Sequence, residues 1–221
     1  PRCVQLAWQV HDIKGKMIEV KNYIIKPEGY DIPFNAEKIH GISTERANKQ
    51  GMPLAEVLAA FVKDVEKSQF VLGHNVSFDI DFINKELNGS YNIYNNGFIC
   101  DTYHLSKIFL YNIYSYKLQS LCTHFSININ KAHRAQDDAV NSGILFIKLI
   151  DELSYCSLND FNNIYKVYSN SIVLNKVLFE NCIKYFIDHS ILRIKEKPNK
   201  ILKRNSYTYI PKKLKTQQNL N

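Results

Sequence analysis

The feature that most constrains the fold of this chain is a change in hydrophobic period along its length. Residues 3–10 place alternate side chains on two faces, which is the period of a β-strand. Residues 17–25 are rich in β-branched and aromatic residues and follow a turn at Gly15, so the two segments predict a β-hairpin. Strand-like and helical segments then alternate up to residue 153, and this order predicts an α/β fold with a sheet of mixed strand direction.

The segments after the hairpin contain residues that typically begin or end helices, and these residues set the expected limits. Gly41 is suited to ending a short helix, and Pro53 is suited to starting one. Short buried strands are expected at residues 70–73 and 98–100. Helices are expected at residues 34–41, from Pro53 through Val65, from Phe78 through Leu87, from Asp101 to Phe109, at 115–125 and at 139–153.

Residues 133–139 place a histidine and two carboxylates directly before an apolar helical run. The histidine is able to take a proton from water, and a carboxylate in the first turn is able to hold a divalent cation. The alternative is a capped helix start with a surface histidine, because carboxylates cap free N–H groups. Of the two carboxylates, Asp137 is expected to be a cap rather than a ligand.

Residues 73–79 form a second polar stretch, where an expected strand runs into an expected helix. Ligand sites in α/β sheets lie beyond the carboxyl ends of strands. Asp79 would lie in the first turn of the helix, where the helix dipole is expected to lower its pKa and keep it ionised. Phe78 could stack on a planar ligand such as a base. The alternative is a capped helix with Phe78 in the core.

The two stretches together resemble the second and third motifs of the DEDDh 3′→5′ exonucleases, the proofreading relatives of the DNA polymerase III epsilon subunit. The resemblance rests on Gly-His-Asn-x-x-Phe-Asp at 73–79 and His-x-Ala-x-x-Asp-Ala at 133–139. Residues 32–33, 39–43, 53–58, 100–102 and 115–118 resemble further landmarks of the family. The resemblance covers residues 1–152, and residues 1–9 resemble the exonuclease domain that some bacteria carry at the start of their replicative polymerase chain.

This resemblance implies a ribonuclease H-like mixed sheet flanked by helices, and two-metal hydrolysis with Mg²⁺ or Mn²⁺. It implies that Asp79 and Asp138 are metal ligands and that His133 is the general base. The residues implied to contact the terminal nucleotide are His40, Phe78 and Asn35. The implied substrate is a single-stranded or frayed DNA 3′ end, and the implied partner is a replicative DNA polymerase. RNA hydrolysis and a non-catalytic tethering role remain alternatives.

The family's first motif, an Asp-x-Glu on its first strand, has no match in this chain. Asp64-Val65-Glu66 matches the Asp-x-Glu pattern in residue type. However, it lies in an expected helix, where the side chains of residues two apart point about 200° apart. Paired ligands need a shared face, as residues two apart have on a strand. The first strand is therefore expected before Pro1, and residues 1–221 alone are expected to be inactive.

The resemblance implies an exonuclease domain at 1–153. Apolar spacing predicts a helical extension at 154–190, and composition predicts a basic, flexible tail at 191–221. The tail has nine Lys or Arg and one Glu, whereas residues 1–190 have nineteen basic and twenty acidic residues. No run approaches the roughly 18 apolar residues of a membrane span. The five scattered cysteines and the absence of a secretory leader predict reduced thiols and a cytoplasmic location.

Overall fold

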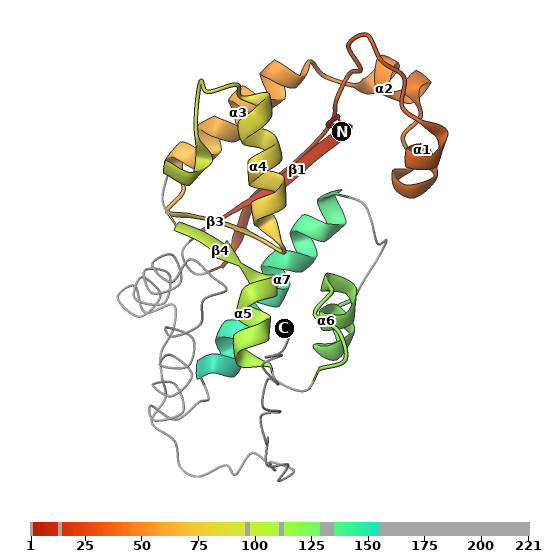
Figure 1. Cartoon of the computed structure of the whole chain (residues 1–221). Coiled ribbons are helices and arrows are strands. Elements are labelled where there is room, and N and C mark those ends of the chain that lie inside the picture. The colour runs from red at the N-terminus through yellow and green to blue at the C-terminus, as the bar shows by residue number, and fades with distance from the viewer. Residues whose placement is uncertain (1, 13–14, 96–97, 111–112, 129–134, 155–221) are drawn as a thin grey trace, which may run out of the picture.

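The computed structural model of the chain describes residues 2–12, 15–95, 98–110, 113–128 and 135–154 (Figure 1). The predicted extension beyond residue 154 and the basic tail lie outside the described residues. The strands are β1 (Gln5–His11), β2 (Met17–Ile24), β3 (Phe70–Gly73) and β4 (Phe98–Asp101). The helices are α1 (Phe34–His40), α2 (Thr44–Gln50), α3 (Leu54–Lys67), α4 (Val76–Glu86), the short 3₁₀ helix η1 (Ile93–Asn95), α5 (Thr102–Phe109), α6 (Leu118–His124) and α7 (Ala135–Ser154).

The described strands form two separate pairs, which together contain both strand directions expected from the sequence. β1 and β2 form the antiparallel hairpin, with Gln5 opposite Ile24. β3 and β4 are parallel, with Gly73 opposite Asp101. Among these four strands, β1 pairs only with β2 and β3 only with β4. The register of the parallel pair matters for the site, because it brings the ends of β3 and β4 together.

The β3–β4 pair lies between two layers of helices, each with its own apolar core. Val71 packs on the core that includes α3 and α4, whereas Phe70 and Leu72 pack on the core that includes α5, α6 and α7. This alternation follows from the two-residue period of a strand. The first core contains Trp8, Val57, Phe61, Val65, Ile80 and Ile83. The second contains Cys100, Leu105, Leu121, Cys122, Leu145, Phe146 and Leu149.

Most helix limits agree with the sequence, and the differences have local causes. α1 ends at His40 because Gly41 adopts the left-handed conformation, with φ of 72°. α2 was not expected, although Ser43 is a good cap and its side chain accepts from the Arg46 N–H at 3.1 Å. α6 begins at Leu118, later than expected. α7 begins at Ala135, four residues earlier than expected.

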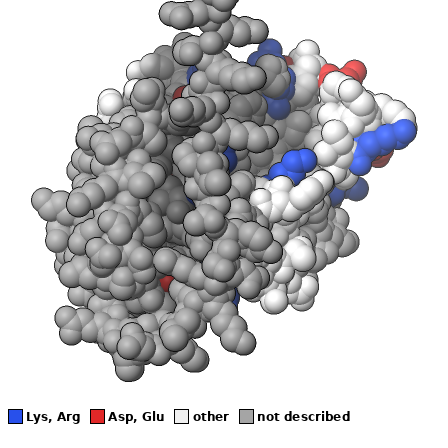
Figure 2. Space-filling view, turned by 60° about the horizontal axis from the view of Figure 1, so that its bottom comes forward, with Lys and Arg blue, Asp and Glu red and all other residues white. Residues whose placement is uncertain are grey.

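The described surface carries charges of both signs. On the face drawn in Figure 2, described Lys and Arg side chains lie separately among uncharged residues, with acidic side chains nearby. This distribution agrees with the near balance of charge in residues 1–190. Within the described residues, no helix is both long and apolar enough to cross a membrane.

Candidate functional site

A cavity of about 1720 Å³ lies between the two strand pairs. Residues of β1 and β3 line it, and Asp79 of α4 and Asp138 of α7 lie on its wall. His40 and Phe78 line the same cavity. Four of the six residues proposed from the sequence for the site are therefore gathered around one space, although they come from segments far apart in the chain.

Asp79 lies in the first turn of α4, as expected, but its ionisation differs from the expectation. Its side chain has exposed surface, yet it lies on a concave wall where protein displaces part of the surrounding water. This partial desolvation raises the pKa of Asp79, and the negative charges of Asp101 and Asp138 raise it further. The prediction of a lowered pKa was wrong because burial and neighbouring carboxylates outweigh the helix dipole.

Asp137 and Asp138 both lie in the first turn of α7. Because α7 starts at Ala135, Asp137 is inside the helix and not at the capping position that precedes it, which corrects the expectation for this residue. Asp138 faces the cavity, and its backbone carbonyl accepts from the Ser142 hydroxyl at 2.7 Å. His133, the predicted general base, lies outside the described residues.

His40 presents a hydrogen-bond donor that has no partner in the described protein. Its Nδ1 accepts from the Ile42 N–H at 3.1 Å, so the proton of the neutral ring is on Nε2. That Nε2 is buried and unpaired. Desolvation lowers the pKa of His40, which favours this neutral form. A ligand oxygen in the cavity would satisfy the Nε2 donor.

Phe78 and Asn35 are both exposed, but only Phe78 lines the cavity. The Phe78 side chain is 68 % exposed, so the alternative that placed it in the core is wrong. Asn35 lies near the start of α1, where its side-chain oxygen accepts from the Ala36 N–H at 3.0 Å. The structure leaves the Phe78 ring available to stack on a planar group.

Asp64, the first residue of the rejected Asp-x-Glu, is part of the packing between α3 and the hairpin. Its Oδ2 accepts from Trp8 Nε1 at 2.8 Å and from Lys21 Nζ at 2.7 Å. Although partial burial opposes it, the hydrogen bonds from Lys21 and Trp8 lower the pKa of Asp64 overall. The Asp64 carboxylate therefore already has two donors, which supports the rejection of this pair as metal ligands.

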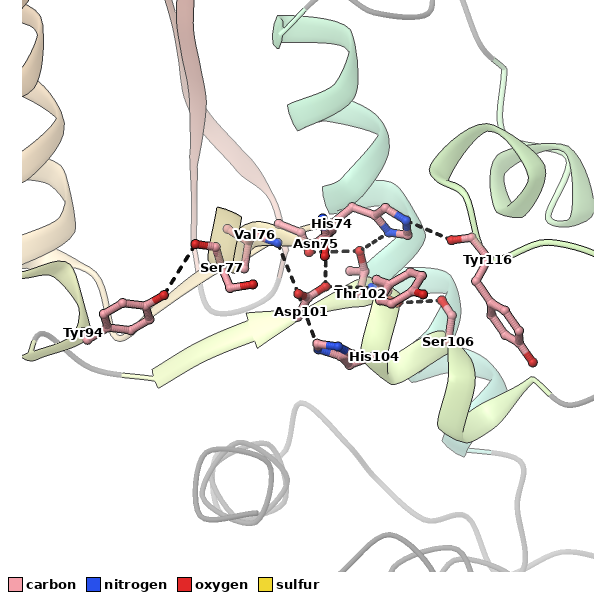
Figure 3. Close-up of polar contacts among 12 residues, drawn as sticks. His74, Asn75, Val76, Ser77, Tyr94, Asp101, Thr102, His104, Ser106 and Tyr116 are labelled. Atoms are coloured by element: carbon pink, nitrogen blue, oxygen red, sulfur yellow. Dashed lines mark hydrogen bonds and ion pairs between the residues drawn. The ribbon is translucent and has the colours of Figure 1, made fainter. Parts of the chain in front are cut away.

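A polar cluster around Asp101 adds to the site a set of contacts that sequence reasoning missed (Figure 3). Asp101 caps α5 by accepting from the Tyr103 N–H at 2.9 Å. It also accepts from the backbone N–H groups of Asn75 and Val76, at the start of α4. The signal available in the sequence was that Asp101 directly follows an expected strand. The parallel pairing of that strand with β3 then places Asp101 beside the β3–α4 junction.

Asp79 and Asp138 supply oxygen ligands of the kind that Mg²⁺ and Mn²⁺ prefer. Desolvation and the charges of Asp101 and Asp138 disfavour the ionised form of Asp79, and a bound cation would favour it again. Within the described part of the chain, no group of three or more His, Cys, Asp or Glu side chains is placed to hold a metal ion. The described residues thus fit part of a metal site.

The exonuclease family model named RNase T matches residues 7–146 of this chain. DNA polymerase III subunit epsilon of Aquifex aeolicus is 32% identical over 145 residues, which are 64% of this chain and 69% of that protein. The 3′-5′ exonuclease DinG of Staphylococcus saprophyticus is 27% identical over 173 residues, which are 78% of this chain and 19% of that protein. A PolC-type DNA polymerase III of Latilactobacillus sakei is 36% identical over 117 residues, 52% of this chain and 7% of that protein.

Two solved structures have a similar fold. A structure of exonuclease I matches with a TM-score of 0.60 at 20% identity, over 76% of this chain and 40% of that one. A zinc-bound complex of Escherichia coli exonuclease I with single-stranded DNA matches with a TM-score of 0.59 at 19% identity, over 75% and 38%. These likenesses confirm the ribonuclease H-like α/β fold. The chain spans only a small part of the DinG and PolC-type relatives.

Proposed function

This chain belongs to the exonuclease family whose model matches residues 7–146, and from that membership we propose that it removes nucleotides from the 3′ end of DNA. The reaction is hydrolysis of the terminal phosphodiester, which releases 5′-mononucleotides. The observation that carries the proposal is that Asp79 and Asp138 line one cavity together with His40, whose Nε2 donor has no partner among the described residues, and the exposed Phe78 ring.

Asp79 and Asp138 are the proposed ligands of two divalent cations, Mg²⁺ or Mn²⁺. Two such ions supply an activated water and stabilise the leaving oxygen in this type of hydrolysis. His133 is the proposed general base, because it precedes α7 by two residues and its ordinary pKa is near neutrality. A base at that point of the chain is close in sequence to the Asp138 carboxylate.

The proposed contacts to the terminal nucleotide use groups with different chemistry. The His40 Nε2–H would donate to an oxygen of the nucleotide, since a neutral imidazole with Nδ1 engaged has only this donor to offer. The Phe78 ring would stack on a base. Asn35 is retained as a contact by its motif position alone, because its oxygen is already used within α1.

The two further carboxylates of the family are proposed to come from a strand that lies between β1 and β3. Both strands have an edge on the cavity that no described strand pairs with. The cavity is lined by apolar side chains of both helix layers, including Phe61 and Phe146, which suits a strand buried on both faces. Asp79 and Asp138 line the same cavity, so carboxylates on such a strand would lie near them.

The relatives suggest the biological setting. They include subunits and PolC-type chains of DNA polymerase III, so we propose proofreading beside a replicative polymerase, in the same polypeptide or in a complex. DinG relatives are named 3′-5′ exonucleases without a polymerase in the name. Co-purification of the full polypeptide with polymerase activity would support the first setting.

The test uses the full polypeptide that contains this chain and a 5′-labelled single-stranded DNA with Mg²⁺ or Mn²⁺. Asp138→Asn should lower the rate more than about 100-fold, because removal of a ligand should cost at least as much as loss of its outer partners. Asp137→Asn is the matched control, since it alters the neighbouring carboxylate of the same helix turn and should keep activity. EDTA should abolish hydrolysis.

Three outcomes would contradict parts of the proposal. A polypeptide that binds no Mn²⁺ and cuts nothing would favour the non-catalytic tethering role. Faster cleavage of a matched RNA oligonucleotide would assign RNA as the substrate. Equal losses in Asp137→Asn and Asp138→Asn would mean that the assignment of Asp138 as the ligand is wrong.

A further inference from the structure

One carboxylate, that of Asp101, lies between the N-termini of two helices (Figure 3). Its Oδ1 accepts from the Tyr103 N–H of α5 at 2.9 Å and from the Asn75 N–H at 2.8 Å. Its Oδ2 accepts from the Val76 N–H at the first residue of α4, at 3.2 Å. Asp101 therefore caps its own helix and, in addition, a helix that begins 25 residues earlier in the chain.

α4 needs this external cap because its own capping residue does not provide one. Asn75 occupies the capping position in the left-handed conformation, with φ of 60° and ψ of 38°, and its side chain makes no capping hydrogen bond. The first N–H groups of a helix have no partner within the helix. The two charged oxygens of Asp101 supply partners to the N–H groups of Asn75 and Val76, and hydrogen bonds to charged groups are the stronger ones.

Strand register is what brings Asp101 to this place. Gly73 lies opposite Asp101 in the parallel β3–β4 pair, so the last residue of β4 faces the junction between β3 and α4. A slip of one residue would move the carboxylate away and send its side chain to the other face of the sheet. The start of α4 is thus fixed relative to the sheet through a single side chain.

His74 holds the other side of the same junction. Its Nε2 lies 3.0 Å from the Tyr116 carbonyl, which only accepts, so Nε2 carries a proton. Its Nδ1 lies 2.9 Å from Thr102 Oγ, and that hydroxyl lies 3.0 Å from the Gly73 carbonyl. The junction is therefore tied to α5 and to the segment before α6 as well.

We propose that Asp101 is a positioning residue for Asp79, acting through its hydrogen bonds to the first turn of α4. The proposal rests on the proposed role of Asp79 as a metal ligand. Asp79 lies one turn into α4, so the place of its carboxylate depends on where that turn begins. Loss of the cap lets the turn fray, and Asp79 then no longer holds a fixed position relative to Asp138.

The experiment compares Mn²⁺ binding and amide hydrogen exchange in the full polypeptide and three variants. Asp101→Ala removes all three accepted hydrogen bonds, whereas Asp101→Asn keeps an oxygen for the Asn75 and Tyr103 N–H groups. Asp64→Asn is the matched control, because it alters another carboxylate with two donors, in α3. We expect Asp101→Ala to weaken Mn²⁺ binding about 10- to 100-fold, the usual effect of removing a group that orients a ligand.

Exchange of the amides of residues 76–79 should become faster in Asp101→Ala, should change less in Asp101→Asn, and should stay unchanged in Asp64→Asn. Mn²⁺ affinity should fall most in Asp101→Ala, should fall less in Asp101→Asn, and should stay unchanged in Asp64→Asn. Unchanged Mn²⁺ affinity in a folded Asp101→Ala protein, or an equal loss in Asp64→Asn, would overturn the proposal. If Asp101→Ala does not fold, the comparison of Asp101→Asn with Asp64→Asn takes its place. Weaker Mn²⁺ binding and faster exchange in Asp101→Asn alone would support the proposal, and equal values in the two variants would overturn it. Absence of Mn²⁺ binding in the unaltered polypeptide would overturn the metal-ligand role of Asp79, while the exchange data would still show whether Asp101 holds α4.

Discussion

Replacing Asp64 by alanine should destabilise the domain without affecting divalent-metal binding. The Asp64 carboxylate joins α3 to the hairpin, through Trp8 on β1 and Lys21 on β2. Trp8 is only 8 % exposed, so water has little access to its indole N–H once the acceptor is removed. The variant therefore leaves a nearly buried donor without a partner.

The magnitude follows from the two lost contacts. An unpaired buried donor costs about 1–3 kcal/mol. Lys21 keeps Glu19 at 3.3 Å, so its loss of Asp64 should add less than about 1 kcal/mol. The expected total for Asp64→Ala is about 1–4 kcal/mol. Asp64→Asn keeps an acceptor for Trp8 and should cost about 1 kcal/mol.

Urea unfolding followed by Trp8 fluorescence measures the effect, because this is the only tryptophan in the chain. The pKa of Asp64 is lowered in the folded state, so its contribution is present above the ordinary aspartate pKa near 4 and is lost as pH falls through the folded pKa. Asp64→Asn should remove this part of the acid sensitivity. An unchanged free energy of unfolding in Asp64→Ala, or a loss of Mn²⁺ binding beyond that expected from unfolding, would refute the reasoning.

Two further predictions concern the core and pH. Leu149→Ala should lower the free energy of unfolding by about 2–5 kcal/mol, because Leu149 is fully buried between α7 and its neighbours, whereas the exposed Lys148→Ala should have little effect in the same urea titration. Desolvation lowers the pKa of His74 in the folded protein. As pH drops below about 6.5, His74 is therefore protonated in the unfolded chain before it is protonated in the folded protein, and the free energy of unfolding should fall. Thermal unfolding between pH 5 and 8 should show a smaller fall in His74→Gln, and an equal fall would contradict this assignment.

Local sequence patterns were sufficient to predict most of the elements. The alternation at residues 3–10 predicted β1, the apolar run at 70–73 predicted β3, and Gly41 predicted the end of α1. Each of these depends on neighbouring residues alone, because strand period and left-handed backbone are local properties. α2 was missed since its seven residues include only one buried side chain, Ala47, and its amphipathic signal is therefore weak.

The motifs identified the family from the sequence, and the family model confirms it. They also selected Asp79 and Asp138, which the structure places on the wall of one cavity. The catalytic and binding roles of these residues remain predictions. The sequence also excluded Asp64-Val65-Glu66 by helical geometry, and the structure supports this with the contacts of Asp64 to Trp8 and Lys21.

What only the tertiary structure decided is how distant groups act on one another. The raised pKa of Asp79 comes from a concave wall and from Asp101 and Asp138, none of which the first turn of α4 reveals by itself. The second role of Asp101, as a cap of α4, depends on the register between β3 and β4. The residues of one strand alone do not determine this register, because it is set by how the two strands pair. Hydrophobic period and capping preference act over a few residues, whereas electrostatic and hydrogen-bond partners are set by packing. The sequence therefore determined the elements and the candidate carboxylates, and the fold determined the environment in which each carboxylate lies.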